Sequence, residues 1–123
     1  MEKTSFEKLI VYHLAEKLAD LSWDIVSKWN HFQKKTLGQQ LVNASDSIGA
    51  NIAEGAGRNT MPDKRKFAVI ARGSLYEVKH WIRRAYKRNL LTKEEITLFQ
   101  DILKELTPKL NAYINSIRKR EKQ

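Results

Sequence analysis

The chain has 123 residues, of which 30% are charged and none is cysteine, and its formal net charge at pH 7 is +9. The length is typical of one domain, and the lack of cysteine excludes disulfides, thiolate metal sites and cysteine nucleophiles. No apolar run approaches the roughly 18 residues of a membrane span, and the N-terminus does not resemble a signal peptide. We therefore expect a single soluble, cytoplasmic domain, residues 1–123, with no membrane partner.

The charge is unevenly distributed along the chain. Residues 1–57 contain 6 Lys/Arg and 7 Asp/Glu, whereas residues 58–123 contain 17 and 7. The second half is therefore strongly basic, which favours an anionic partner, most commonly nucleic acid. The alternative is a lysine- and arginine-rich surface that only keeps the protein soluble.

The first predicted helix covers residues 5–31, and Thr4 and Glu7 have the spacing of a capping box at its start. A stripe of apolar residues recurs along it at intervals of three, four or seven residues. The stripe consists of Val11, Leu14, Leu18, Leu21, Ile25 and Phe32.

The second predicted helix, residues 37–57, contains only two charged residues, Asp46 and Glu54. One side of it is an apolar stripe, and the opposite side carries small or apolar residues where a polar face is expected. The stripe consists of Leu37, Leu41, Ala44, Ile48 and Ile52. Such a helix is usually buried on two sides, so we expect another copy of the protein to cover the second one. Gly55 and Gly57 are predicted to end this helix in the left-handed conformation.

Two further helices complete the chain. Thr60, Pro62 and Asp63 signal the start of a third helix that runs to about Leu90. Thr92 and Glu95 form a capping box for the fourth, in which Pro108 should cause a kink or be absorbed locally. The inward stripes are Phe67, Ala71, Ser74, Val78, Ile82 and Ala85 on the third helix, and Ile96, Phe99, Leu103, Leu106, Leu110, Tyr113 and Ile117 on the fourth. Long amphipathic helices joined by short loops predict an all-α, antiparallel up-down four-helix bundle.

Two motifs carry a family resemblance. The string Asn51-Ile52-Ala53-Glu54-Gly55 and the element Ala71-Arg72-Gly73-Ser74 with Glu77 resemble signatures of the bacterial four-helix bundle proteins named for 23S rRNA intervening sequences. The resemblance implies a homopentameric ring. It also implies a distant kinship with the accessory variability protein of diversity-generating retroelements, which works with a reverse transcriptase and nucleic acid. Many members have arginine after a Gln-Leu pair where this chain has Val42, so any role of that arginine is not carried over.

A ridge of small residues spaced four apart, Ser45, Gly49, Ala53 and Gly57, allows a second helix to approach closely. Tight packing inside one bundle is the alternative, but the apolar stripe lies on the other side of this helix, so we expect a subunit interface. The predicted interface residues are Val42, Ser45, Gly49, Ala53, Ala56 and Gly57.

Polar residues flank the second and third helices and are expected to form a buried hydrogen-bonded network rather than a polar pocket. The predicted network comprises Gln40, Ser47, Asn51, Glu54, Ser74 and Glu77. Glu77 and His80 form an E-x-x-H pair, but a di-iron bundle needs a second copy, so neither a metal nor another cofactor is expected.

Basic residues cluster on the third helix within an arc of about 80°, opposite its core stripe. The predicted nucleic-acid-binding residues are Arg58, Arg65, Arg72, Lys79, Arg83, Arg84, Lys87 and Arg88. Tyr76 lies inside the arc and could stack on a base. Arg72 also lies near the polar network, and at its wheel position we expect exposure or an interface role rather than burial. A solvated face without a ligand is the alternative.

These observations predict a non-enzymatic, homo-oligomeric protein that binds RNA or DNA through a basic helix, because no paired acid, base and nucleophile are recognisable. A scaffold that recruits an acidic protein partner is the second hypothesis.

Overall fold

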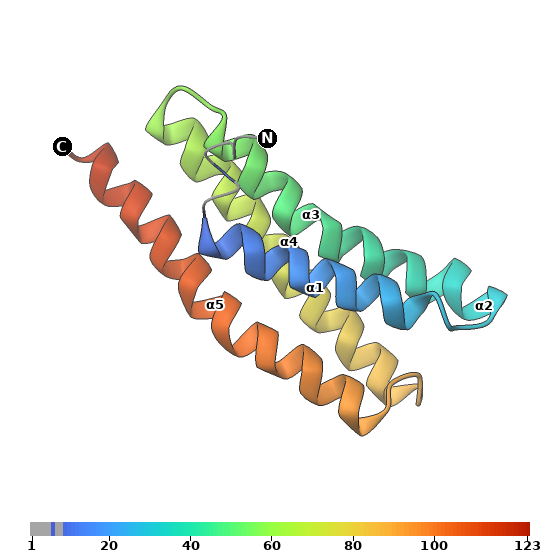
Figure 1. Ribbon diagram of the computed structural model, residues 1–123. Helices are drawn as coiled ribbons and strands as arrows, with labels where there is room; N and C mark the ends of the chain where they lie inside the picture. Colours follow the sequence, from blue (N-terminus) through green and yellow to red (C-terminus); the bar gives the residue numbers. More distant parts are fainter. Residues whose placement is uncertain (1–5, 7–8) are drawn as a thin grey trace, which may run out of the picture.

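The computed structural model describes residue 6 and residues 9–123, and these fold into four long helices arranged as an up-down bundle (Figure 1). The helices are α1 (Ile10–Val26), α3 (Gln39–Ala56), α4 (Met61–Lys87) and α5 (Lys93–Glu121). Each packs on two neighbours, with α1 and α4 both lying between α3 and α5. The predicted all-α four-helix bundle is confirmed.

Most of the core comes from the predicted stripes, but the described core also contains residues outside them: Ala15, Val26, Ala68, Leu75 and Ile114. Leu18, Leu41, Ile48, Val78 and Phe99 are completely or almost completely buried. Several stripe residues near the bundle surface are half-buried: Leu21, Phe67, Ile82, Ile96, Leu103 and Tyr113.

The first helix is shorter than predicted, because the chain turns after Val26 and restarts. Asn30 caps a short helix, α2 (His31–Gln33), and exchanges hydrogen bonds with Gln33 in a capping box. Phe32 is consequently 73% exposed, so its assignment to the core stripe was wrong. The predicted capping box of Thr4 and Glu7 lies outside the described residues.

Between α2 and α3 the chain forms a π-helical turn, η2 (Lys34–Gly38). Leu37 in this turn is buried, and a Cβ added to Gly38 would lie 2.7 Å from Val26 Cγ1. A side chain at residue 38 would therefore require Val26 or the backbone of η2 to shift.

The end of α3 differs from the prediction. Gly57 caps the helix with φ −85°, and no glycine in the described part of the chain has a positive φ, so the left-handed cap was wrong. Instead, the Gly57 amide bonds to the carbonyls of Ala53 and Glu54. The left-handed residue is Asn89, φ 58°, two residues beyond the end of α4 at Lys87.

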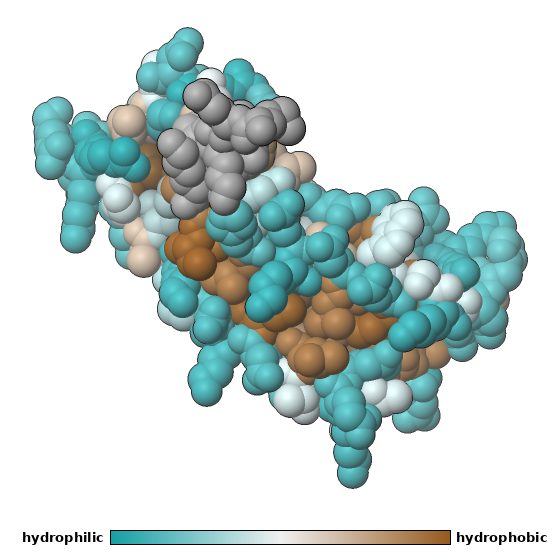
Figure 2. All heavy atoms as spheres, in the orientation of Figure 1, coloured by the Kyte–Doolittle hydropathy of each residue, from teal (hydrophilic) through white to brown (hydrophobic). Residues whose placement is uncertain are grey.

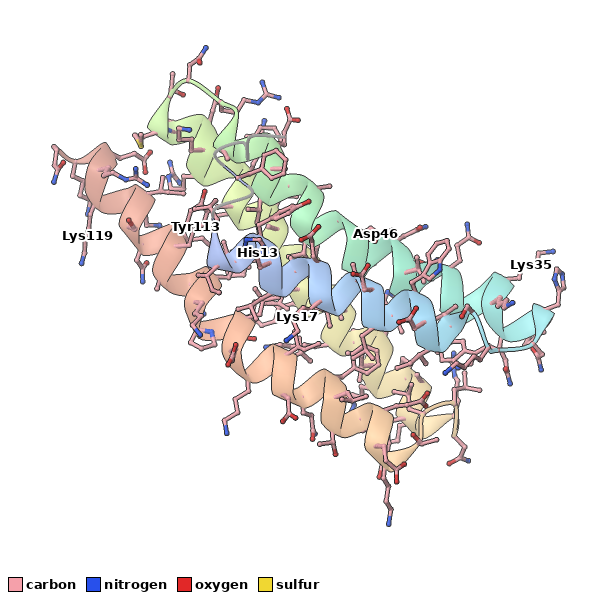
Figure 3. All side chains as sticks on the ribbon, in the orientation of Figure 1. His13, Lys17, Lys35, Asp46, Tyr113 and Lys119 are labelled. Atoms are coloured by element: carbon pink, nitrogen blue, oxygen red, sulfur yellow. The ribbon has the colours of Figure 1, made fainter. Side chains whose placement is uncertain are left out.

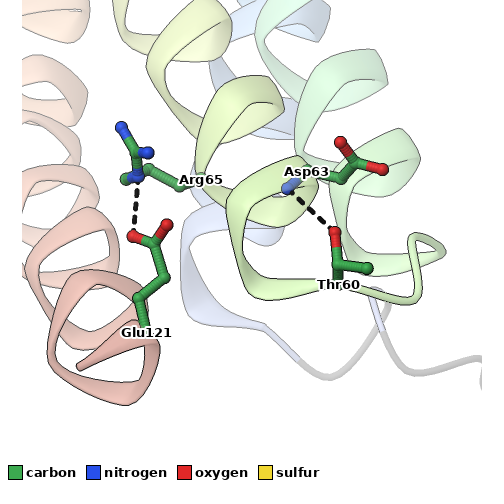
Figure 4. Close-up of polar contacts among 4 residues, drawn as sticks. All are labelled: Thr60, Asp63, Arg65 and Glu121. Carbon is green, nitrogen blue, oxygen red and sulfur yellow. Dashed lines mark hydrogen bonds and ion pairs between the residues drawn. The ribbon is translucent and has the colours of Figure 1, made fainter. Parts of the chain in front are cut away.

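The predicted starts of α4 and α5 are confirmed. The Asp63 amide donates to Thr60 Oγ1 at 3.3 Å (Figure 4), and Thr92 and Glu95 form the reciprocal capping box. α5 continues through Pro108, whose side chain is exposed. The proline is thus absorbed within one helix.

Figure 2 shows a band of hydrophobic residues along the face where α1 and α5 lie side by side, bordered by hydrophilic residues. Exposed apolar side chains on these two helices include Ile10, Trp23 and Leu98. None of the described helices combines the length and the apolar character that a bilayer span requires.

Candidate nucleic-acid interface

The first half of α4, residues 61–74, carries two of the predicted basic residues, and both contact α5. Arg65 Nε lies 2.7 Å from Glu121 Oε2 in an ion pair (Figure 4), and an Arg72 guanidinium nitrogen donates to Asn111 Oδ1 at 3.2 Å. Arg72 bonds to Asn111 of α5 and not to a residue of the polar network, and it is only half-exposed. It therefore belongs neither to that network nor fully to a basic face. These two arginines connect α4 to α5.

Arg58 lies before α4 and is also engaged within the chain. It forms an ion pair with Glu54 one turn earlier, and its guanidinium carbon lies 4.7 Å from the ring centroid of Phe67. Arg58 is therefore paired within the chain, as Arg65 is.

The second half of α4, residues 75–87, presents Lys79, Arg83 and Lys87 at intervals of four residues. About 100° per residue places the three in one line along the helix. Arg83 and Lys87 are exposed and have no ion pair or side-chain hydrogen bond to any residue that the structure describes; the Lys79 ammonium lies 5.2 Å from the ring centroid of Tyr76. We call these three residues the cationic line.

Arg84 and Arg88 lie outside the cationic line. At about 100° per residue they lie roughly 100° and 140° around the helix from Arg83. Arg84 is half-buried and Arg88 is the C-cap of α4. They add positive charge to this end of the bundle without belonging to the same face.

An open groove of about 680 Å³ runs between α4 and α5 beside the cationic line. Its apolar surface comes from Ile82, Ile96 and Leu103, all half-buried. The remaining lining residues are polar, basic or aromatic: Lys79, Arg83, Tyr86, Lys93, Thr97 and Gln100. We call this feature the α4–α5 groove.

Sequence reasoning missed Tyr86, Lys93 and Gln100. The available signal for Tyr86 was its position seven residues after Lys79, which places both on one helix face. Lys93 and Gln100 belong to the next helix, so only the packing of α5 on α4 brings them to the groove.

The predicted polar network forms only in part. Ser47 and Ser74 hydroxyls lie 2.9 Å apart between α3 and α4, and the Asn51 amide donates to the Ser47 hydroxyl and carbonyl at 3.0 and 2.8 Å. Gln40 and Glu54 are exposed instead, and Glu77 accepts a hydrogen bond from Trp81 Nε1 at 3.3 Å. Their assignment to a buried network was wrong, because their side chains reach solvent or local partners on the helix surface.

The small-residue ridge of α3 is partly occupied within the chain. Ser45 is fully buried and its hydroxyl lies 2.8 Å from that of Ser22 on α1, so it is not available to another subunit. A Cβ at Gly49 would touch Tyr12 at 3.6 Å. The other predicted interface residues remain accessible to some degree: Val42, Ala53 and Ala56 are half-buried, and Gly57 is exposed.

Two acidic residues lie beside this ridge. Asp20 and Asp46 line a groove between α1 and α3, where Asp46 is labelled in Figure 3. Partial burial, and then the Asp20 carboxylate, raise the pKa of Asp46 above its ordinary value. In the described part of the chain, no three His, Asp or Glu residues gather closely enough to hold a metal ion.

Comparison with known proteins assigns the fold to a family. The family model described as 23S rRNA-intervening sequence protein matches residues 7–112, which include both motifs, the polar network and the cationic line. A search of curated proteins finds no match. The chain therefore belongs to the 23S rRNA-intervening sequence protein family.

Proposed function

We propose that this protein is a non-enzymatic, cytoplasmic, homo-oligomeric nucleic-acid-binding protein whose cationic line contacts phosphates. One observation carries the proposal: Arg83 and Lys87 are exposed and form no ion pair with any acid that the structure describes, whereas Arg58 and Arg65 are ion-paired. Unpaired cations in a regular line suit a polyanion, because each one that contacts a phosphate releases counterions. Such contacts position a backbone and do not read its sequence, so low sequence specificity is expected.

Self-assembly is the second part of the proposal. Val42, Ala53 and Ala56 leave α3 with a partly accessible surface of small and apolar side chains, which another helix can approach closely. A ring of subunits, which the family resemblance gives as a pentamer, would repeat the cationic line. Repetition raises the apparent affinity for a long polyanion without any new contact.

Fluorescence anisotropy with labelled RNA and DNA at several salt concentrations tests the binding. We expect affinity to fall steeply with salt. The triple variant K79A/R83A/K87A should lose roughly ten- to a hundredfold in affinity at low salt, and its log–log salt slope should shrink by about two to three.

The matched control is K17A/K28A/K35A, which removes the same charge from exposed positions on α1, the loop after it and η2 (Lys17 and Lys35 are labelled in Figure 3). This control should keep most of the salt slope. Equal losses in both triple variants would mean that only net charge matters. Absence of binding at low salt, with capture of an acidic protein instead, would favour the scaffold hypothesis.

The assembly is tested by replacing an accessible alanine of α3. Ala53→Arg should reduce the mass measured by light scattering while the helical circular dichroism is kept. Ala112→Arg, at an exposed alanine of α5, is the control and should leave the mass unchanged. Full assembly of the Ala53→Arg variant would place the interface elsewhere.

A further inference from the structure

The α4–α5 groove has a composition that the cationic line alone does not explain. A phosphate-binding surface needs only charge, yet this groove adds an aromatic ring and an apolar floor. We propose that the groove accepts an unpaired base of a single-stranded nucleic acid, with the base stacked on Tyr86. This inference rests on the proposed function and names its substrate class.

Tyr86 provides the stacking surface. Its side chain is 54% exposed although it lines the groove, and the half-buried Ile82 and Ile96 lie on the same floor. A nucleobase is flat and aromatic, so it can cover both the tyrosine ring and this apolar floor while its sugar stays in water. Stacking on aromatic side chains is the usual way in which proteins hold unpaired bases.

Polar groups lie where the edge of such a base would reach. The exposed Gln100 side chain forms no hydrogen bond with another described residue, so both its amide donor and its carbonyl acceptor are available. The Thr97 hydroxyl donates to the Lys93 carbonyl at 3.0 Å and keeps its oxygen as an acceptor. An amide and a hydroxyl can pair with several bases, which fits weak sequence preference.

Cationic side chains line the groove from both helices. Lys79 and Arg83 belong to α4, and Lys93 belongs to the start of α5. A strand whose base enters between the two helices would therefore have positive charge on either side for the phosphates that flank the base.

The same arrangement discriminates against duplexes. In a duplex each base is stacked between its neighbours and paired, so it cannot present a free face to Tyr86 without first being extruded. A duplex would contact the cations alone and leave the apolar floor in water. The groove thus favours single strands over duplexes of equal charge.

Anisotropy competition between an unstructured single strand and a duplex of the same length tests the inference at fixed salt. Wild-type protein should prefer the single strand by about tenfold, as expected for one stacked base. Tyr86→Leu should remove that preference without changing the salt slope, and Tyr86→Phe should keep it. A 2-aminopurine in the single strand should lose fluorescence on binding to wild-type protein and not to Tyr86→Leu.

The matched control is Trp23→Leu. Trp23 is a similarly exposed aromatic residue of α1 (61%) that does not line the groove, so its loss should leave the single-strand preference intact. Circular dichroism melting of each variant separates lost binding from lost folding.

The outcomes distinguish this inference from the proposed function. Equal affinity for both nucleic acids and no effect of Tyr86→Leu, with K79A/R83A/K87A still weakened, would overturn the groove inference alone. No binding of either nucleic acid at low salt would overturn both. Tighter binding of an acidic glutamate–tyrosine copolymer than of the single strand would assign the groove to an acidic protein and overturn the inference too.

Discussion

Arg65 and Arg83 lie on the same side of α4, because a separation of eighteen positions makes about five whole turns. Arg65 forms an ion pair with Glu121, whereas Arg83 lines an open groove and meets no acid among the described residues. The difference comes from α5, which runs antiparallel to α4. Its end offers oxygen acceptors, Asn111 and Glu121, to the first half of α4, and its start offers Lys93 and Gln100 to the second half.

The comparison separates two uses of polar side chains on one helix. The first half of α4 uses Arg65 and Arg72 to hold α5, and the second half leaves Arg83 and Lys87 without a partner among the described residues. Substitutions in the first half should therefore change stability, and substitutions in the second half should change binding.

The largest expected effect on stability is at Gly55, where α3 meets the first half of α4. A Cβ there would lie 2.9 Å from Phe67 Cβ and 3.3 Å from the Lys64 carbonyl oxygen, so the two helices would have to move apart. Gly55→Ala should lower the free energy of unfolding by about 1–3 kcal/mol, measured by urea denaturation. An unchanged urea midpoint would mean that α3 and α4 accommodate the added methyl group without moving apart.

The next effect concerns the Ser47–Ser74 hydrogen bond at the end of the first half of α4. Ser74 is buried and its hydroxyl pairs with Ser47, so Ser74→Ala leaves a half-buried hydroxyl without that partner. We expect a loss of about 1–2 kcal/mol. In a double-mutant cycle, the combined Ser47→Ala/Ser74→Ala variant should lose less than the sum of the two single variants; simple additivity would show that the two hydroxyls do not interact.

A matched pair of arginine variants tests the comparison directly. Arg65→Gln should lower the free energy of unfolding by about 0.5–1 kcal/mol, because it removes a partly exposed ion pair, and should leave nucleic-acid affinity almost unchanged. Arg83→Gln should do the reverse, with an unchanged melting temperature and a salt slope smaller by about one. If both variants behaved alike in both measurements, the two halves of α4 would not differ in the way described.

Periodicity predicted most of the fold. Four apolar stripes and the capping signals at Thr60 and Thr92 were enough to place three of the four long helices, because each signal is local. The errors lie at the ends of helices rather than in their interiors. The Asn30–Gln33 capping box restarts the chain as α2, η2 fits Gly38 against Val26, and Gly57 ends α3 without a positive φ.

The candidate site was predictable only in part, because contacts between helices decide which cations are paired within the chain. A helical wheel identifies Lys79, Arg83 and Lys87 as one line, but it cannot show that Arg65 and Arg72 are held by α5. Nor can it show that Ser45 is buried against Ser22 on another helix. Whether a cation is structural or free depends on whether a neighbouring helix offers it a partner. Such partners are set by how the helices pack and cannot be read from residue spacing.

The smallest expected effect is at Gly73, at the end of the first half of α4. Apart from the adjacent residues and the helix's own backbone, no atom of a described residue lies within 4 Å of a Cβ added there. The residue is exposed in a helix interior, where glycine costs about 0.5–1 kcal/mol relative to alanine. Gly73→Ala should therefore stabilise the isolated bundle by that amount in urea denaturation. If the variant instead assembled less well by light scattering, a neighbouring subunit would have to lie against Gly73. The first half of α4 would then hold helices of two chains rather than one.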